Sequence, residues 1–350
     1  MFESQSLLVT GGTGSFGQKL VERLLDRDPP KRLIVFSRDE LKQSEMAQRF
    51  SPRVHRCLRY FLGDIRDRER LFRALDGVDV VIHAAALKQV PSCEYNPLEA
   101  VKTNVLGAAN LIDAAIDRRV QKIIALSTDK AASPINLYGA TKLCADKLFI
   151  AANHYSGPHP TRFAVVRYGN VVGSRGSVVP LFLKMRPHGL VPVTDPRMTR
   201  FWITLEQGVD FVLSSLERMR GGEIFVPKIP TMNILDLARA VAPGCRVEPV
   251  GIRPGEKLHE TMISEDDARH TLEYDDHFVI LPDPQHMLFE RSTDMDTGRP
   301  CPEGFSYTSD ANPQRLSMGE LRRMLGLAEL DPEPISSGAS MHGGLESVEE

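Results

Sequence analysis

The stretch Ser6-Leu7-Leu8-Val9-Thr10-Gly11-Gly12-Thr13-Gly14-Ser15-Phe16-Gly17 decides the fold. An apolar run ends at glycines, and a segment with helical periodicity, Ser15–Arg27, follows. Gly11, Gly14 and Gly17 give the pattern G-x-x-G-x-x-G. Glycine lets a backbone turn sharply and approach a pyrophosphate, and the start of a helix offers unpaired N–H groups to it. Because this pattern stands between a predicted strand and a predicted helix, it predicts a dinucleotide-binding loop rather than a tight turn alone.

Strand-like and helix-like segments alternate through the first half of the chain. After the first strand, the predicted strands are Arg32–Ser37, Leu58–Gly63, Val78–Ala84, Lys122–Ser127 and Phe163–Tyr168. The predicted helices between them include Asp39–Phe50, Pro97–Asp117 and Leu137–Asn153. Continuous Val, Ile and Leu runs separated by helices indicate strands buried on both faces. We therefore predict an α/β fold, a Rossmann-type doubly wound parallel sheet with a smaller C-terminal substrate-binding lobe.

The regular alternation ends after Gly169. We predict a dinucleotide-binding domain over residues 1–170, its core continuing to about 200–225, and a lobe with interleaved segments over 171–330. The predicted elements of this second half are Thr204–Arg218, Glu223–Pro227, Asn233–Val241, Val247–Ile252 and Met318–Leu325. Residues from 283 onward show no motif with an assignable role. The polar segment 331–350 is predicted to be a disordered tail.

Composition excludes several classes of protein. The 350 residues hold 43 Lys and Arg against 46 Asp and Glu, a net charge of -3, which argues against a nucleic-acid binder. Five dispersed cysteines without a Cys-x-x-Cys pair argue against a disulfide framework and a cysteine-rich zinc site, and we expect no metal. No basic segment precedes a hydrophobic leader, and no run of about 18 apolar residues could cross a bilayer. We expect a cytoplasmic protein that does not bind membranes.

The ends of the predicted strands carry residues suited to a dinucleotide. Arg38 follows the second strand, where a basic residue accommodates a 2′-phosphate, so it favours NADP; Asp39 comes directly after it. Asp64 and Ile65 follow the third strand, at the expected place of the adenine. The small residues from His83 to Ala86 would let the cofactor lie close to the fourth strand.

Two groups of residues suggest acid–base chemistry. Tyr138 and Lys142 form Y-x-x-x-K, which places both on one helix face, and the ammonium favours the phenolate. Such a tyrosine can take a proton from a sugar hydroxyl during hydride transfer. Thr128-Asp129-Lys130 follows the fifth strand, and Asp129 with Lys130 offers the acid and base that a 4,6-dehydratase needs. A sugar-nucleotide 4-epimerase would have no use for that pair, and a non-catalytic NADP-binding sensor would not need Tyr138 and Lys142.

With these motifs the chain resembles the extended short-chain dehydrogenase/reductase family. Within it, the chain resembles the inverting UDP-N-acetylglucosamine 4,6-dehydratases of pseudaminic acid biosynthesis. It extends from about Leu7 to Ile280 and is carried by these strings: SRDELKQSEMA, HAAALKQVPSCEYNP, ALSTDKAASPINLYGATKL, VVRYGNVVGSRGSVVP, MTRFWIT, GGEIFVPKIP and GIRPGEKLHE. The retaining 4,6-dehydratases look similar in the core, but many carry an N-terminal membrane segment that this sequence lacks. In the related dTDP-glucose dehydratases, Glu stands where this chain has Lys130.

The resemblance implies a reaction. Tyr138 would take the 4-hydroxyl proton, Lys130 would abstract the C5 proton, and Asp129 would help to expel the C6 hydroxyl. Hydride would return to C6, and reprotonation on the opposite face would invert C5. The product would be UDP-2-acetamido-2,6-dideoxy-β-L-arabino-hex-4-ulose. The implied partners are UDP-N-acetylglucosamine, tightly held NADP, and further copies of the chain in a dimer or hexamer.

The resemblance also implies binding residues. Cofactor contacts are expected from Gly11, Thr13, Gly14, Ser15, Phe16, Gly17, Ser37, Arg38, Asp39, Glu40, Leu41, Lys42, Asp64, Ile65, Ala85, Leu126, Ser127, Tyr138 and Lys142. Substrate contacts are expected from Lys88, Thr128, Asn170, Val171, Arg175, Val178, Thr194, Arg200, Arg253 and Glu256. The arginines suit a diphosphate because a guanidinium donates two parallel hydrogen bonds.

Overall fold

A ten-stranded sheet forms the centre of the molecule. The computed structural model describes residues 2–157, 161–173, 178–283 and 298–327. Seven parallel strands stand in the order β3-β2-β1-β4-β5-β6-β10, and β15, β14 and β16 extend the sheet beyond β10 in antiparallel fashion. The parallel strands are β1 (Ser6–Thr10), β2 (Arg32–Ser37), β3 (Leu58–Leu62), β4 (Val80–His83), β5 (Lys122–Thr128), β6 (Arg162–Tyr168) and β10 (Ile224–Pro227). The antiparallel strands are β14 (Thr271–Glu273), β15 (His277–Ile280) and β16 (Arg299–Pro300).

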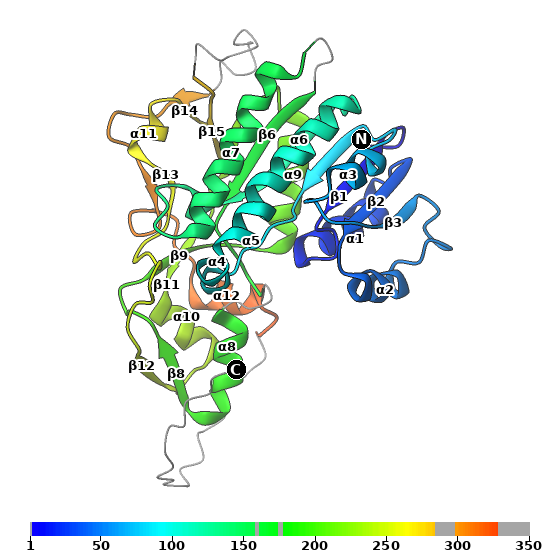
Figure 1. Cartoon of the computed structure of the whole chain (residues 1–350). Helices are drawn as coiled ribbons and strands as arrows, with labels where there is room; N and C mark the ends of the chain where they lie inside the picture. The colour runs from blue at the N-terminus through cyan, green and yellow to red at the C-terminus, as the bar shows by residue number, and fades with distance from the viewer. Residues whose placement is uncertain (1, 158–160, 174–177, 284–297, 328–350) are drawn as a thin grey trace.

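Helices cover both faces of this sheet (Figure 1). α1 packs against α9 in one layer, whereas α3, α6 and α7 pack side by side in the other. The helices of the main body are α1 (Ser15–Arg27), α2 (Glu40–Arg49), α3 (Arg68–Ala74), α4 (Val90–Tyr95), α5 (Pro97–Val101), α6 (Gly107–Asp117), α7 (Leu137–Tyr155), α9 (Leu205–Arg218) and α11 (Glu265–Ala268). Every residue of β1 and β4 is buried, as expected for strands covered on both faces. The predicted doubly wound sheet is confirmed.

The structure differs from the prediction in several places. β14, β15 and β16, which lie within the range predicted for the smaller lobe, extend the main sheet. The predicted helix Pro97–Asp117 is divided by a π-helical turn, Lys102–Leu106, in which one extra residue enters the turn. The predicted strand Glu223–Pro227, grouped with the smaller lobe, is β10 of the main sheet. It pairs in parallel with β6 and is buried along its whole length, so the core needs it as a seventh parallel strand.

A smaller lobe stands at the carboxyl ends of the parallel strands, where β7 follows β6 after one residue (Figure 1). It has its own buried core, which includes Phe182, Trp202, Leu237 and Leu321. Its strands are β7 (Asn170–Val171), β8 (Leu190–Val193), β9 (Thr199–Ile203), β11 (Thr231–Asn233) and β12 (Arg246–Pro249). Its helices are α8 (Val178–Met185), α10 (Ile234–Val241) and α12 (Met318–Met324).

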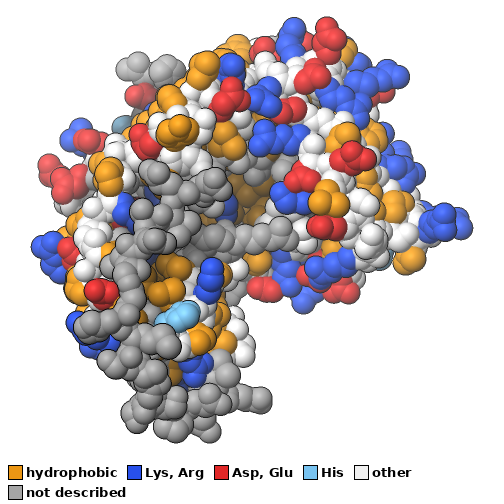
Figure 2. All heavy atoms as spheres, turned by 60° about the horizontal axis from the view of Figure 1, so that its bottom comes forward, with side chains coloured by type: hydrophobic (Ala, Val, Ile, Leu, Met, Phe, Trp, Pro, Cys, Tyr) orange, Lys and Arg blue, Asp and Glu red, His pale blue; other side chains and the backbone are white. Residues whose placement is uncertain are grey.

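A short antiparallel pair, β13 (Thr261–Ile263) with β17 (Tyr307–Thr308), runs between the main sheet and the lobe. Figure 2 shows a hollow between the main body and the lobe, with hydrophobic and basic side chains at its margin. Among the described residues, no helix is long and apolar enough to cross a membrane. The predicted contact Arg175 and the predicted tail 331–350 lie outside the described residues.

Candidate active site

The loop between β1 and α1 brings backbone unusually close to backbone. Gly11 has a φ of +64°, and a Cβ atom there would lie 2.8 Å from the backbone of Ala85. A Cβ on Gly17 would lie 2.5 Å from Gly12, so α1 can begin this close to the loop only with glycine. Gly14 precedes α1 without a capping side chain, which leaves the N–H groups of the first turn available to a phosphate. The loop therefore fits a pyrophosphate.

At the end of β2, the carboxylate of Asp39 is engaged by neighbouring groups, whereas the guanidinium of Arg38 is exposed. The Ser37 hydroxyl lies 2.8 Å from the Thr13 hydroxyl and joins this strand end to the glycine loop. Asp39 caps α2 by accepting from the Lys42 N–H at 3.0 Å, and its other oxygen lies 2.7 Å from the Lys42 ammonium. Hydrogen bonds from Lys42 lower the pKa of Asp39. The Arg38 side chain keeps 55% of its surface exposed, so its charge remains accessible at this edge.

The end of β3 lies beside Arg38. The Asp64 carboxylate is 3.8 Å from the Arg38 guanidinium and 2.7 Å from that of Arg66. Ile65 is buried, whereas Leu41 on α2 is 69% exposed. The predicted cofactor residues thus gather at the carboxyl ends of β1 to β5, the edge at which doubly wound sheets bind ligands.

The acid–base pair sits in a single turn, Asp129–Ala131, that follows β5 directly. Thr128 shapes this turn: its hydroxyl accepts from the Lys130 N–H at 3.3 Å and donates to Asp129 Oδ1 at 2.9 Å. The Lys130 ammonium lies 3.0 Å from the same oxygen. Asp129 is only 1% exposed, and its Oδ2 is buried without a hydrogen-bond partner. A proton can therefore pass directly between the lysine and the aspartate.

Helix α7 brings the tyrosine to this turn. The Asn136 side chain caps the helix by accepting from the Gly139 N–H at 2.8 Å. One residue into the helix, Tyr138 brings its phenol near enough to the Thr128 hydroxyl and the Lys130 ammonium for both to lower its pKa. Burial raises the pKa of Tyr138 to about 12, and the nearby charge of Lys130 acts in the opposite direction. Tyr138, Thr128, Asp129 and Lys130, all expected to act together, are brought together by the fold.

Lys142 lies one turn further along α7 and is 4% exposed. Burial lowers its pKa, while the carboxylate of Asp146 raises it. Asp146 accepts from the Ser127 hydroxyl at 2.7 Å and lies 3.8 Å from the Arg167 guanidinium. The Ser127 hydroxyl, expected to contact the cofactor, thus donates to a buried carboxylate.

Glu260 is a member of the site that the sequence analysis did not single out. Its side chain is 3% exposed, and Oε1 lies 3.4 Å from the Lys130 ammonium and 3.6 Å from Arg200 Nε. Oε2 is buried without a hydrogen-bond partner. Glu260 ends the string GIRPGEKLHE, but 130 residues separate it from Lys130, and no spacing rule connects the two.

Arg200, expected to bind the diphosphate, has several internal partners. Its guanidinium donates to the carbonyl oxygens of Thr199, Leu258 and Lys257 at 2.8, 3.0 and 2.9 Å, in addition to the contact with Glu260. It therefore holds the chain segment 257–260 against β9.

Of the remaining predicted substrate residues, two lie on a loop beside α7 and the others stand on separate elements. The loop with Arg253 and Glu256 lies beside α7, because the Asn136 amide donates to the Gly255 carbonyl at 2.8 Å. The others stand on separate elements, and within the described part of the chain no hydrogen bond or ion pair joins them to Asp129, Lys130 or Tyr138. These are Lys88 after β4, Asn170 and Val171 in β7, Val178 in α8, and Thr194 after β8.

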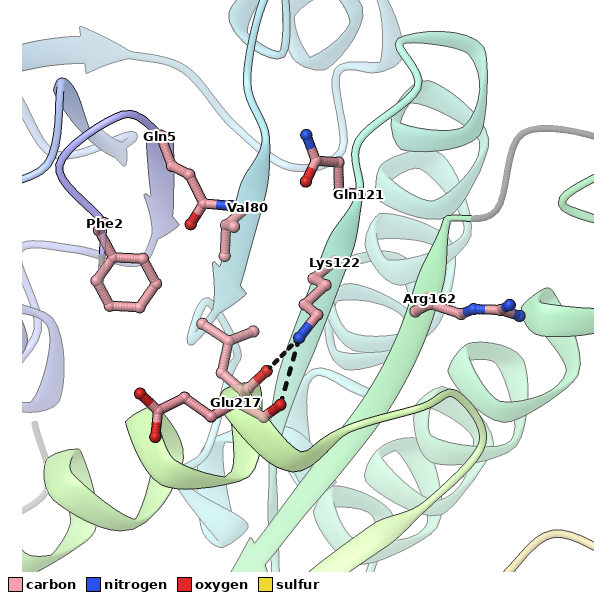
Figure 3. Close-up of a pocket in the computed structure, with 8 residues that line it drawn as sticks. Phe2, Gln5, Val80, Gln121, Lys122, Arg162 and Glu217 are labelled. Atoms are coloured by element: carbon pink, nitrogen blue, oxygen red, sulfur yellow. Dashed lines mark hydrogen bonds between the residues drawn. The ribbon is translucent and has the colours of Figure 1, made fainter. Parts of the chain in front are cut away.

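A separate pocket of about 430 Å³ lies at the opposite edge of the sheet, where the strands begin (Figure 3). It is lined in part by Phe2, Gln121 and Arg162. The Lys122 ammonium donates to the carbonyl oxygens of Leu216 and Glu217 at the end of α9, so it serves as a helix cap. None of the acid–base residues lines this pocket.

Comparisons with known proteins agree with this geometry. Residues 7–282 match the family model described as "Polysaccharide biosynthesis protein". The chain belongs to this family. It is 54% identical to a UDP-N-acetylglucosamine 4,6-dehydratase (inverting) of Campylobacter jejuni subsp. jejuni, over 94% of this chain and 99% of that protein. The predicted resemblance to the inverting dehydratases is confirmed.

Solved structures of other proteins also resemble this chain. Pen from Bacillus thuringiensis superposes with a TM-score of 0.83 at 37% identity, covering 93% of this chain and 98% of that one. DesIV, a dTDP-glucose 4,6-dehydratase from Streptomyces venezuelae with NAD bound, gives a TM-score of 0.65 at 25% identity, covering 72% and 86%. Structures of this fold thus hold a nicotinamide dinucleotide, and the glycine loop described above fits one.

Proposed function

We propose that the protein is an NADP-dependent UDP-N-acetylglucosamine 4,6-dehydratase that inverts C5, as its similarity to the Campylobacter protein suggests. The observation that carries the proposal is the Asp129–Lys130 contact of 3.0 Å within reach of Tyr138. A redox tyrosine alone would serve an epimerase. An acid and a base that contact each other beside this tyrosine can also remove water from the sugar.

In this proposal each of the three residues carries out a different proton transfer. Tyr138 accepts the proton of the 4-hydroxyl group. The glycine loop with Gly11, Gly14 and Gly17 would hold NADP, which would supply the acceptor and later the donor of the hydride that moves from C4 to C6. Transfer of one proton from Lys130 to Asp129 gives a neutral amine and a neutral acid, and exclusion of water by substrate favours that uncharged pair. Lys130 then takes the C5 proton, Asp129 protonates the departing C6 hydroxyl, and reprotonation of C5 on the opposite face inverts this carbon.

The choice of NADP over NAD rests on the end of β2. A carboxylate there usually binds the ribose hydroxyls of NAD, but Asp39 is occupied as a helix cap and by Lys42. Arg38 remains exposed and can pair with a 2′-phosphate.

The assembly and the cellular role are part of the same proposal. Tyr95, Leu98 and Leu106 are 88%, 61% and 52% exposed on α4, α5 and the π-helical turn, which supports a dimer or hexamer. We place the enzyme in the cytoplasm, at the start of pseudaminic acid biosynthesis. Light scattering of the purified chain tests its assembly.

One experiment tests the reaction. The protein is incubated with UDP-N-acetylglucosamine and NADP in D₂O, and the product is followed by NMR. We expect loss of the C6 hydroxymethyl signals, a new methyl group, deuterium at C5 and the inverted C5 configuration. An unchanged C5 configuration would identify a retaining dehydratase. UDP-N-acetylgalactosamine as the sole product would contradict the proposal.

A further inference from the structure

Glu260 approaches the acid–base pair from a distant part of the chain. It immediately precedes β13, and its Oε1 lies between the Lys130 ammonium, at 3.4 Å, and Arg200 Nε, at 3.6 Å. Lys130 thus contacts two nearly inaccessible carboxylates, Asp129 on its own turn and Glu260 from a distant part of the chain. Each of these carboxylates has one buried oxygen without a partner.

Hydrogen bonds from the backbone of Glu260 to Ser309 fix the position of this residue. The Glu260 N–H donates to Ser309 Oγ at 2.8 Å, and the Ser309 N–H donates to the Glu260 carbonyl at 2.8 Å. The Ser309 hydroxyl also lies 2.7 Å from that of Thr199, the neighbour of Arg200 on β9. Ser309 is completely buried. One serine therefore fixes Glu260 relative to the strand that carries its arginine partner.

The charges around Lys130 nearly balance. The groups that face it are Asp129 and Glu260, which are acidic, Arg200 and Lys257, which are basic, and the phenol of Tyr138. Burial lowers the pKa of Lys130, but Asp129 and Glu260 outweigh that effect and raise it above its ordinary value. A buried carboxylate oxygen without a hydrogen bond is costly, and such groups in native proteins call for an explanation beyond stability.

We propose that Glu260 is a positioning residue for C5 proton abstraction: its carboxylate holds the Lys130 nitrogen beside Asp129 and stabilises the ammonium that forms when Lys130 takes the proton. In that step the C5–H bond breaks, its electron pair moves toward the C4 carbonyl, and an N–H bond forms on Lys130. The inference rests on the proposed function, because it assigns Glu260 to one step of that reaction. Hydride transfer from C4 does not require this carboxylate.

The test compares Glu260→Gln, which removes the charge, with Glu260→Asp, which keeps it. Glu223→Gln is the matched control: Glu223 is fully buried, and its carboxylate accepts from the N–H groups of Arg220 and Gly221, away from Lys130. Deuterium uptake at C5, reduction of NADP and affinity for UDP-N-acetylglucosamine are measured for each protein. Both rates are recorded against pH.

We expect Glu260→Gln to slow C5 exchange by about 10- to 100-fold, as for loss of a hydrogen bond to a charged group. NADP reduction and substrate affinity should stay within about threefold of wild type. In the pH profile of C5 exchange, the limb that reports deprotonation of Lys130 should move to lower pH. Loss of the neighbouring anion lowers the pKa of this amine. Glu260→Asp should keep the limb in place with an intermediate rate, and Glu223→Gln should exchange C5 at the wild-type rate.

Two results would overturn the inference. One is wild-type exchange in Glu260→Gln. The other is an equal loss of NADP reduction and C5 exchange in both Glu260 variants with an unmoved pH profile, which a purely structural role predicts. If Glu260→Gln does not fold, Ser309→Ala decides, because it removes the hydroxyl that accepts from the Glu260 N–H and keeps the backbone bond from the Ser309 N–H to the Glu260 carbonyl. Selective slowing of C5 exchange supports the inference, and an unchanged rate contradicts it. A wild-type protein that does not dehydrate UDP-N-acetylglucosamine would instead refute the proposed function.

Discussion

A Cβ atom on Gly139 would lie 2.1 Å from the carbonyl oxygen of Lys130, so the first turn of α7 rests directly on the turn that carries the acid–base pair. Real Cβ atoms do not approach a backbone atom this closely. The position of Tyr138, the residue before Gly139, is therefore set by the backbone of Lys130 rather than by side-chain packing alone.

Gly139→Ala should displace α7 from this turn. We expect the free energy of unfolding to fall by about 1–3 kcal/mol, as for other overpacked sites, and dehydration to slow at least tenfold. Urea denaturation and the rate of product formation check this. Gly208→Ala is the control: Gly208 is also helical, nothing lies within 4 Å of its would-be Cβ, and the change should stabilise the protein by about 0.5–1 kcal/mol.

Lys130→Ala should abolish proton abstraction from C5 and leave the binding of NADP intact. Without the amine, C5 has no base, while the glycine loop and Tyr138 stay in place. The variant should bind NADP with wild-type affinity and yet exchange no deuterium at C5. Exchange at the wild-type rate would show that another group is the base.

Tyr138→Phe should stop the reaction earlier. The ring still fills its place on α7, but no oxygen remains to receive the 4-hydroxyl proton. Stopped-flow absorbance should record no reduction of NADP after substrate is added. Full activity would contradict the assignment.

Arg38→Ala should weaken the binding of NADP more than the binding of NAD. Loss of a hydrogen bond between charged groups predicts a 10- to 100-fold higher Kd for NADP, by the order of magnitude usual for such bonds, and little change for NAD. Calorimetric titration measures both constants. Arg53→Ala removes another exposed arginine and should change neither. Equal loss of both cofactors would argue against a 2′-phosphate contact.

His83 should make the folded state sensitive to acid. It is buried, its Nδ1 lies 2.7 Å from the Thr10 hydroxyl, and burial lowers its pKa to about 3. The unfolded chain protonates this residue near pH 6.5, so its contribution is complete above that pH and is lost as the pH falls toward 3.

Between pH 6.5 and pH 5 the loss amounts to about 2 kcal/mol from this residue. His83→Gln should show a smaller decrease over that interval in urea denaturation. The same decrease in both proteins would mean that His83 does not titrate as described.

The sequence was most informative where interactions are local. The strand Arg32–Ser37 has the predicted bounds because its inner residues Leu33, Ile34, Val35 and Phe36, buried on both faces of the sheet, form a continuous apolar run. Tyr138 and Lys142 both lie on α7, as their four-residue spacing predicts.

Glu260 and the placement of β10 could not be predicted in this way. Glu260 reaches Lys130 only after the chain has passed through most of the smaller lobe. β10 is distinguished from a lobe strand by its pairing with β6 and β15. The partners of Asp39 and Arg200 likewise appear only in the folded chain, because capping and carbonyl contacts depend on the backbone.

The bond between Ser309 and Glu260 also sets an order of events during synthesis. The glycine loop, the Asp129–Lys130 turn and Tyr138 all emerge from the ribosome within the first half of translation. The partner that fixes Glu260 emerges more than 160 residues later than Tyr138. A nascent chain can therefore fold its dinucleotide-binding strands early, while the complete set of charges around Lys130 is assembled only near the end of translation.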